Sequence, residues 1–305
     1  MHIQEVEFQT VDGLTLRGDL YPAAPGSDGT RRAGPAIVMT PGFNCVKEMF
    51  VPEVAEQFQK AHITALVYDP RTLGLSDGTP RNDIDPIKQV SDYSDALTFL
   101  RSGAVPHVDP QQVGVWGFSF SGVVALCAAS LDPRVRFCVA ICPLLNLEYE
   151  AAKFPKVLAK VMRDRESQLA GNAPLYVPVL TADGKNPAGM GIGADKEEFD
   201  YMVNAKMRGA PRHENHTTFQ SYYKIKLWQP QGIMRYLTRT PVLMVVPELD
   251  QISPPEAQIA LHGTFPEPKL LHIAPGKQHL NVLSGDDFPF LSSLQSKFVH
   301  DISKA

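Results

Sequence analysis

The most constraining part of this chain is a short segment in which an apparent strand passes directly into an apparent helix. Residues 113–116 are apolar and have the composition of a buried strand, and residues 123–129 are Ala-rich and have that of a buried helix. Between them lies Gly117-Phe-Ser-Phe-Ser-Gly122. A strand that turns at once into a helix needs one strained residue, with small neighbours that make room for it. We therefore expect Ser119 at the tip of a sharp turn.

A serine held at such a turn is a candidate nucleophile. Its hydroxyl projects clear of the backbone, and the amide of the next residue, Phe120, points toward any oxyanion that forms. The usual pattern is Gly-x-Ser-x-Gly; here Ser121 takes the place of the second glycine, and Gly122 follows one position later. As a bare pattern the motif also occurs by chance in loops. The hypothesis therefore depends on whether the chain supplies a base, an acid and a second oxyanion donor.

Apolar segments alternate with amphipathic segments from residue 35 onward, which predicts an α/β fold with a mostly parallel sheet covered by helices on both faces. Before them, residues 1–22 alternate in polarity around Asp12-Gly13, which predicts an N-terminal antiparallel hairpin. The expected strands of the main sheet lie at 35–40, 63–68, 113–116, 135–142, 241–246 and 269–273, and the expected helices at 47–61, 85–100, 123–129, 255–262 and 291–302, with one helix closing at 233–237.

The alternation of apolar, strand-like segments with amphipathic, helix-like segments stops near residue 143 and resumes near residue 231. Residues 143–230 contain helical patches, such as 149–168, and a Gly-rich loop at 182–194, but no clear strand. The glycines of this loop follow no strand, so a flexible loop is favoured over a phosphate-binding loop. We interpret 143–230 as a helical lid inserted into a core formed by residues 1–142 and 231–305.

An acid and a histidine follow the last two expected strands. Asp250 comes after the strand at 241–246 and His279 after the strand at 269–273, so the order is Ser, Asp, His. Parallel strands gather their reactive groups at their carboxyl edge, which makes His279 the expected base and Asp250 the carboxylate that orients it. Alternatives remain: Asp250 as a helix cap, Glu248 as the acid, and His213 or His216, in the insertion, as the base.

The second oxyanion donor is expected in the loop after the first parallel strand. Gly42 permits a tight turn there, and the amide of Phe43 can point back toward the serine. Cys45 is close to this turn, and we favour packing over a role as a second nucleophile. Asp69 and Arg71 could form an ion pair that fixes a loop near the site, and we favour a structural role over catalysis.

Composition excludes several classes of partner. The net charge is −4 and no dense basic patch is present, so no nucleic-acid partner is expected. No apolar run approaches the ~20 residues that span a bilayer. The four cysteines lack metal-ligand spacing, and neither a metal nor a cofactor is expected. The N-terminus shows no secretory signal, which favours the cytoplasm; the ending Ser303-Lys-Ala305, similar to a peroxisomal signal except at its last residue, makes the peroxisome a weaker alternative.

At this point the chain resembles the α/β-hydrolase family over nearly its whole length. The loop after the second parallel strand is similar to the family's Asp-x-Arg-Gly-x-Gly-x-Ser motif, with Thr72 where glycine is usual. The resemblance implies a nucleophilic Ser119 with a lid over the active site. It rests on Pro41-Gly-Phe43, Tyr68-Asp-Pro-Arg-Thr-Leu-Gly-Leu-Ser-Asp-Gly78, Gly117-Phe-Ser-Phe-Ser-Gly122, Asp250 and His279.

A narrower resemblance comes from the opening stretch Glu7 to Gly18 together with the Gly117-to-Gly122 turn. Both are similar to a fungal subgroup of thiohydrolases and polyketide transferases of secondary metabolism. This resemblance implies a polyketide acyl substrate, held as an ester, lactone or thioester and delivered by a polyketide synthase. Transfer of the acyl group to a small alcohol, condensation or cyclisation with His279 as base, and a non-catalytic binding protein remain alternatives. The oligomeric state is open, with a dimer among the options.

Overall fold

The computed structural model describes residues 2–26, 29–30, 32–190 and 196–304. Its main element is an eight-stranded sheet with strand order β1-β2-β4-β3-β5-β6-β9-β10. β1 pairs antiparallel with β2, and β2 antiparallel with β4, whereas all other pairs are parallel, so the expected hairpin and mostly parallel sheet are confirmed. The strands are β1 Gln4–Gln9, β2 Thr15–Tyr21, β3 Gly34–Thr40, β4 Thr64–Tyr68, β5 Val108–Phe118, β6 Cys138–Ile141, β9 Val242–Pro247 and β10 Lys269–Ala274.

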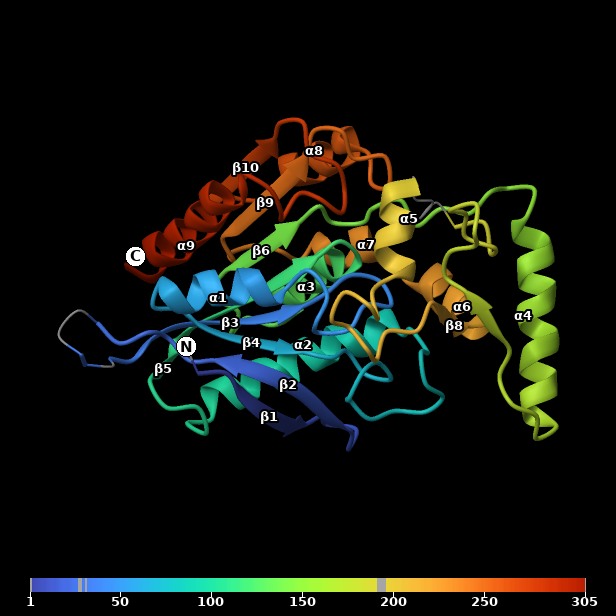
Figure 1. Ribbon diagram of the computed structural model, residues 1–305, viewed down its shortest axis with the longest axis horizontal. Helices are drawn as coiled ribbons and strands as arrows, with labels where there is room; N and C mark the ends of the chain where they lie inside the picture. Colours follow the sequence, from blue (N-terminus) through green and yellow to red (C-terminus); the bar gives the residue numbers. More distant parts are fainter. Residues whose placement is uncertain (1, 27–28, 31, 191–195, 305) are drawn as a thin grey trace.

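Helices cover both faces of this sheet (Figure 1). Successive strand residues point to opposite faces, so Ala36 and Val38 pack in one buried cluster and Ile37 and Met39 in another. The first cluster is closed by α2 and α3 and the second by α1 and α9. The described helices that lie before residue 143 or begin at residue 230 or later are α1 Pro52–Lys60, α2 Pro86–Arg101, α3 Phe120–Leu131, α7 Pro230–Met234, α8 Pro255–Gly263 and α9 Phe288–Lys304.

The first helix is shorter than its apolar spacing predicts. We expected a helix over 47–61, but α1 begins at Pro52, and turns occupy most of the residues before it. Asn44 and Phe50 have φ values of 56° and 65°. Residues with positive φ cannot continue a right-handed helix, whereas proline is well suited to a first helical turn.

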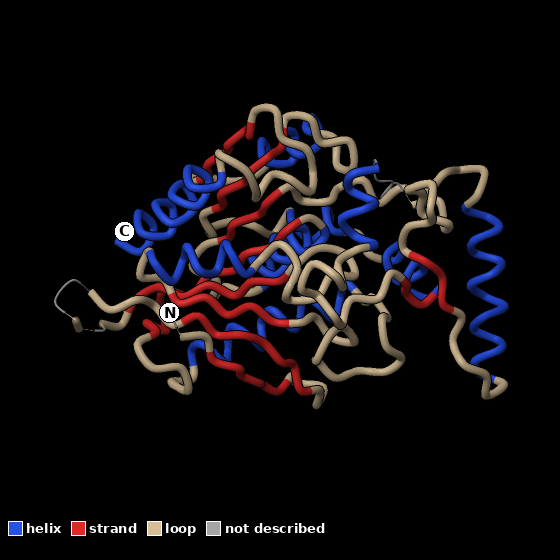
Figure 2. Tube along the Cα trace, in the orientation of Figure 1, coloured by secondary structure: helices blue, strands red, loops and turns tan. Residues whose placement is uncertain are grey.

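The described residues within 143–230 form the helices α4 Phe154–Leu169, α5 Lys196–Val203 and α6 Phe219–Leu227. They also contain two short strands, β7 Tyr176–Pro178 and β8 His216–Thr218, which pair antiparallel, so the expectation of no strand here was wrong. Figures 1 and 2 show this segment beyond the carboxyl ends of the parallel strands, with α4 furthest from the sheet. Part of the expected Gly-rich loop, residues 191–195, lies outside the described residues. No helix in the described part of the chain is both long and apolar enough to cross a membrane.

Candidate active site

Ser119 occupies the tight turn between β5 and α3. Its backbone has φ 56° and ψ −120°, the strained conformation that this turn requires. A Cβ on Gly117 would lie 2.0 Å from the carbonyl oxygen of Ser121, so glycine is needed at that position. Ser121 itself donates a short hydrogen bond from its hydroxyl to the carbonyl of Pro41. The serine that replaces the second glycine of the usual motif therefore links the turn to the loop after β3 by a hydrogen bond.

The structure brings the predicted base and acid to Ser119. The Nε2 atom of His279 lies 2.7 Å from the Oγ of Ser119, and the Nδ1 atom of His279 lies 2.8 Å from Oδ2 of Asp250. All three residues are buried. In this arrangement the imidazole can accept the hydroxyl proton of Ser119 while the carboxylate holds the opposite ring nitrogen.

Several donors hold the carboxylate of Asp250 in place. Its Oδ1 atom accepts hydrogen bonds from the backbone amides of Ile252 at 2.9 Å and Ser253 at 2.8 Å, and its Oδ2 atom accepts a third from Nε2 of Gln258 at 3.1 Å. The carboxylate thus orders the loop before α8 and contacts His279 at the same time. Glu248, the alternative acid, is exposed and accepts a hydrogen bond from the amide of Gly276 instead.

The loop that was expected to carry the second oxyanion donor lies directly beside the serine. A Cβ on Gly42 would lie 3.2 Å from the Cβ of Ser119, which shows how closely the two backbones approach. The rings of Phe43 and Phe120 meet edge to face, with centroids 5.3 Å apart. The two residues whose amides we expect to bind an oxyanion are therefore neighbours at the site.

The residue after Phe43 is a further part of the site that the sequence analysis missed. Asn44 is buried, and its Nδ2 atom donates a 2.6 Å hydrogen bond to the carbonyl of Glu214 in the 143–230 segment. Its Oδ1 atom accepts a hydrogen bond from Asn82, whose own carbonyl accepts one from the amide of Thr218 at 3.0 Å. The only signal in the sequence was an asparagine, which tolerates a positive φ, directly after the expected oxyanion loop.

The cavity at Ser119 is small and mostly apolar. Its volume is about 60 Å³. Three of its walls, Val179, Leu180 and Met202, come from the 143–230 segment. The remaining lining residues are Gly42, Phe43, Cys45, Phe50, Phe118, Leu144, Ile252, His279 and Leu280.

The two alternative histidine bases do not line this cavity. His213 is buried, and neither ring nitrogen has a hydrogen-bond partner among the described residues. Its burial lowers the pKa of the imidazole to about 4, so the ring is neutral at pH 7. His216 lies on β8, where its ring packs edge to face against Tyr176.

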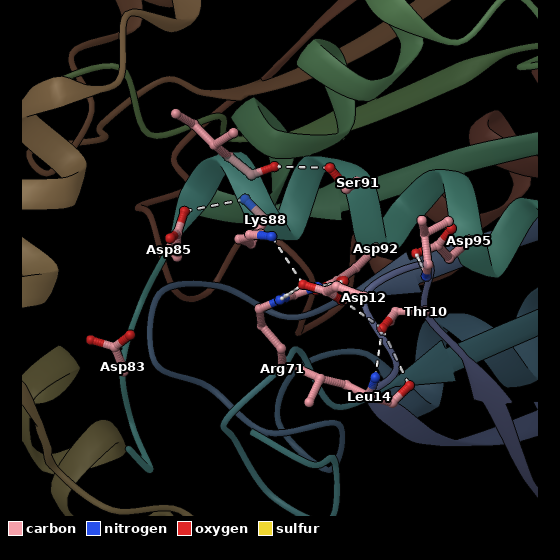
Figure 3. A network of polar contacts seen from close by, with 12 residues as sticks. Thr10, Asp12, Leu14, Arg71, Asp83, Asp85, Lys88, Ser91, Asp92 and Asp95 are labelled. Carbon is pink, nitrogen blue, oxygen red and sulfur yellow. Dashed lines mark hydrogen bonds and ion pairs between the residues drawn. The ribbon is translucent and has the colours of Figure 1, made fainter. Parts of the chain in front are cut away.

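Asp69 and Arg71 do not pair with each other, so the interpretation of an ion pair between them was wrong. Arg71 instead donates from Nε and Nη2 to the buried carboxylate of Asp92 and, along a second edge of the guanidinium, from Nη1 and Nη2 to Asp12 in the β1–β2 turn (Figure 3). The carboxylate of Asp69 accepts hydrogen bonds from two backbone amides, those of Lys47 and Leu75. Burial raises the pKa of Asp69 to about 6. Through these two hydrogen bonds Asp69 holds the chain at Lys47, after the loop that follows β3, against the chain at Leu75.

Cys45 is a buried thiol near the site. Burial raises its pKa to about 12, so it is protonated at neutral pH and is a poor nucleophile. All four cysteines are buried, and none of them forms a disulfide. Among the described residues, no group of three or more His, Cys, Asp or Glu side chains is arranged to hold a metal ion.

Comparison with known proteins shows which family this chain belongs to. A family model described as alpha/beta hydrolase fold matches residues 35–286. A thiohydrolase from Eupenicillium brefeldianum is 60% identical over 97% of this chain and 93% of that protein, and the polyketide transferase ATR5 from Stachybotrys chlorohalonatus is 44% identical over 99% and 98%. The crystal structure of the alpha/beta hydrolase GrgF from a Penicillium species, 38% identical, superposes with a TM-score of 0.88 over all of both chains. The chain belongs to the α/β-hydrolase family.

Proposed function

We propose that this enzyme cleaves an ester, lactone or thioester of a polyketide-type small molecule through an acyl-enzyme on Ser119. The observation that carries the proposal is the chain of contacts from Ser119 Oγ to His279 Nε2, at 2.7 Å, and from His279 Nδ1 to Asp250, at 2.8 Å. The names of the relatives, thiohydrolase and polyketide transferase, support the substrate class. The acyl group is expected to arrive on a polyketide synthase or as a free small molecule.

Acylation begins when Ser119 Oγ attacks the substrate carbonyl carbon and His279 Nε2 takes the hydroxyl proton. The amides of Phe43 and Phe120 then bind the tetrahedral oxyanion, and each preset donor lowers the barrier by about 3 kcal/mol. The carboxylate of Asp250 stabilises the imidazolium and keeps its ring oriented. As the tetrahedral intermediate collapses, His279 gives its proton to the departing thiolate or alkoxide, and the acyl group stays on Ser119.

Deacylation repeats these steps with a second nucleophile. Water, or an alcohol in its place, approaches the acyl carbon, and His279 Nε2 takes its proton. The carbon–oxygen bond to Ser119 breaks, and the serine oxygen recovers that proton. The same three side chains therefore serve hydrolysis and acyl transfer, and which one dominates depends on what reaches His279.

We assign residues 143–230 the role of a lid over the core formed by 1–142 and 231–305. Val179, Leu180 and Met202 extend from this segment over Ser119 and make the cavity apolar, which suits a hydrocarbon-rich acyl chain. The cavity is small, at about 60 Å³, so we expect a long acyl chain to displace some of these side chains.

The proposal is tested by labelling the protein with a fluorophosphonate probe and comparing it with Ser119→Ala. Labelling that is lost in the variant supports a nucleophilic Ser119. Turnover of a thioester substrate that survives in Ser119→Ala contradicts the acyl-enzyme and favours condensation or cyclisation with His279 as the base. The absence of both labelling and turnover in the wild-type protein favours a binding protein on this fold.

A further inference from the structure

Gln258 is a buried glutamine on α8 whose amide binds the acid of the site. Its side chain is fully buried, at 0% exposure. The Nε2 atom donates one hydrogen bond to Oδ2 of Asp250 at 3.1 Å and another to the carbonyl of Ser253 at 2.6 Å. Oδ2 is also the oxygen that lies 2.8 Å from Nδ1 of His279. Gln258 and His279 therefore share one carboxylate oxygen.

The orientation of this amide follows from its partners. An amide group donates from its nitrogen and accepts at its oxygen. If the Gln258 amide were reversed, Oε1 would face the carboxylate of Asp250 and the carbonyl of Ser253, which are both acceptors. In the structure, Nε2 makes both bonds, and the buried Oε1 has no hydrogen-bond partner among the described residues. A buried oxygen without a donor is costly, which indicates that the donating nitrogen is the part of Gln258 that this position needs.

With Gln258, the carboxylate of Asp250 has its full set of donors. Oδ1 accepts from the amides of Ile252 and Ser253, and Oδ2 is shared by Gln258 and His279. A carboxylate offers about four such sites. Of the four donors, His279 alone can gain a proton. Because the three neutral donors already stabilise the buried charge, the imidazole can stay neutral, which is the form that accepts the proton of Ser119.

The other titratable groups around Asp250 and His279 are neutral, bonded elsewhere or exposed. In the cavity wall, Cys45 is protonated at neutral pH, and Cys142 donates from Sγ to the carbonyl of His279 at 3.6 Å. α8 packs against β9 and β10, and β9 carries no titratable side chain. On α8, β10 and the loops beside them, Lys269 binds the carbonyl of Phe265, Lys277 pairs with Asp287, Glu248 accepts from the amide of Gly276, His272 packs on Phe290, Glu256 is exposed, and burial lowers the pKa of His262. All of these groups are unchanged in the variants compared below.

We propose that Gln258 is a positioning residue that acts on His279 through Asp250. Its amide holds Oδ2 in front of Nδ1 and takes up part of the carboxylate's charge, so that the base stays unprotonated to a lower pH. This assignment rests on the acyl-enzyme proposed above, in which a neutral His279 activates Ser119. It gives Gln258 a part in setting the pH range of the enzyme, in addition to the packing of α8.

The first test is Gln258→Met, which has a similar length but no donor. The pH profile of kcat/KM is measured with p-nitrophenyl acetate, and its acid limb is the range in which the free enzyme's base gains a proton. We expect this limb to move up by about one pH unit, because the charge of Asp250 loses a hydrogen bond and is stabilised by an imidazolium instead. At the alkaline end, kcat should stay within threefold and KM within twofold. A limb that stays in place or moves down overturns the proposal.

Gln59→Met is the matched control. Gln59, on α1, is also buried, and its Nε2 atom donates to the carbonyls of Pro22 at 2.9 Å and His2 at 3.4 Å. Its Oε1 atom likewise has no partner among the described residues. The two glutamines thus differ in that Gln258 binds an acid. Gln59→Met should lower the thermal unfolding midpoint without moving the acid limb, and an equal movement in both variants would show a general effect of destabilisation and contradict the proposal.

A second variant, Gln258→Asn, covers the case in which Gln258→Met does not fold. Asparagine keeps the amide but is one methylene shorter, so its nitrogen no longer reaches Oδ2 of Asp250. We expect the acid limb to move up as in Gln258→Met, with a smaller loss of stability. Circular dichroism and thermal unfolding establish that each variant is folded. An unmoved limb in a folded Gln258→Asn contradicts the role of Gln258.

The outcomes separate this inference from the function on which it rests. Fluorophosphonate labelling of Ser119 together with an acid limb that does not respond to the changes at Gln258 contradicts the positioning role alone. Undiminished p-nitrophenol release by Ser119→Ala contradicts the acyl-enzyme itself, and the role of Gln258 fails with it.

Discussion

The side chain of Asn44 joins the loop beside Ser119 to the carbonyl of Glu214, 170 residues later in the chain, through a 2.6 Å hydrogen bond. Asn44 directly follows Phe43, whose amide we propose as an oxyanion donor. The position of that amide is therefore coupled to the 143–230 segment. A movement of this segment that breaks the bond would also loosen the oxyanion loop.

Asn44→Gly should lower kcat about tenfold with little change in KM. Glycine accepts the φ of 56° found at this position, so the change removes the side-chain hydrogen bonds without adding backbone strain. An oxyanion donor acts mainly in the transition state, and its misplacement therefore appears in kcat. Steady-state kinetics on a p-nitrophenyl ester provide the measurement. A change confined to KM would show that Asn44 supports substrate binding instead.

Ser119→Ala should reduce turnover by roughly 10⁴-fold or more, because no other group can form the acyl-enzyme. Ser121→Ala is the matched control at the same turn. It removes the hydrogen bond to the carbonyl of Pro41 but leaves the nucleophile, so a loss of no more than about tenfold is expected. Burst kinetics and circular dichroism on both variants make the comparison. Equal losses in the two would mean that the turn, and not the hydroxyl of Ser119, is what the reaction needs.

Asp250→Asn should lower kcat by about 10⁴-fold, since an amide no longer fixes the histidine tautomer that accepts the serine proton. Glu248→Gln tests the alternative acid, two positions earlier. Its carboxylate is exposed and binds the amide of Gly276, so we expect less than a twofold change in kcat. A larger loss of kcat in Glu248→Gln than in Asp250→Asn would assign the role of the acid to Glu248.

His213→Phe should stabilise the fold at pH 7 by about 1 kcal/mol, because it replaces a buried ring whose nitrogens have no partner among the described residues. The pH dependence should change as well. Burial lowers the pKa of His213 in the folded state to about 4 from an ordinary value of 6.5, so protons bind preferentially to the unfolded chain. The wild-type protein should therefore lose up to about 3 kcal/mol through this residue as the pH falls from 6.5 to 4.

His213→Phe has no imidazole to titrate, so its stability does not fall through this residue at low pH. The difference in folding stability between the variant and the wild type should therefore grow as the pH falls. Thermal unfolding midpoints of both proteins at pH 7 and pH 5 provide the measurement. Curves that run parallel across this range would show that His213 does not titrate as its burial requires.

Much of the fold could be predicted because buried parallel strands are continuous apolar runs. The alternation from β3 to β10 and the hairpin around Asp12-Gly13 are both confirmed. Ser119, Asp250 and His279 could be nominated for a related reason: each follows a strand, and the carboxyl ends of parallel strands meet at one edge. The distances between these three side chains could not be predicted from the positions of the strands.

Other features depend on contacts that no local pattern encodes. β7 and β8 have three residues each, too few to show a period of two. The start of α1 was misplaced because its apolar spacing continues through Phe50, whose positive φ excludes a helix. The hydrogen bond from Asn44 to Glu214 joins residues that are distant in the sequence, so it becomes visible only once the chain is folded.

The strand order has a consequence for how the enzyme is made. β6 pairs with β9, which follows it in the chain only after the 143–230 segment, and β10 then pairs with β9. While the chain is being synthesised from its N-terminus, the edge of β6 stays unpaired until β9 emerges, and His279 arrives later still. An apolar strand edge is a template for aggregation. Chains that end between residues 142 and 242 would therefore lack His279 and leave this edge of β6 unpaired, so we expect them to be inactive and prone to aggregation.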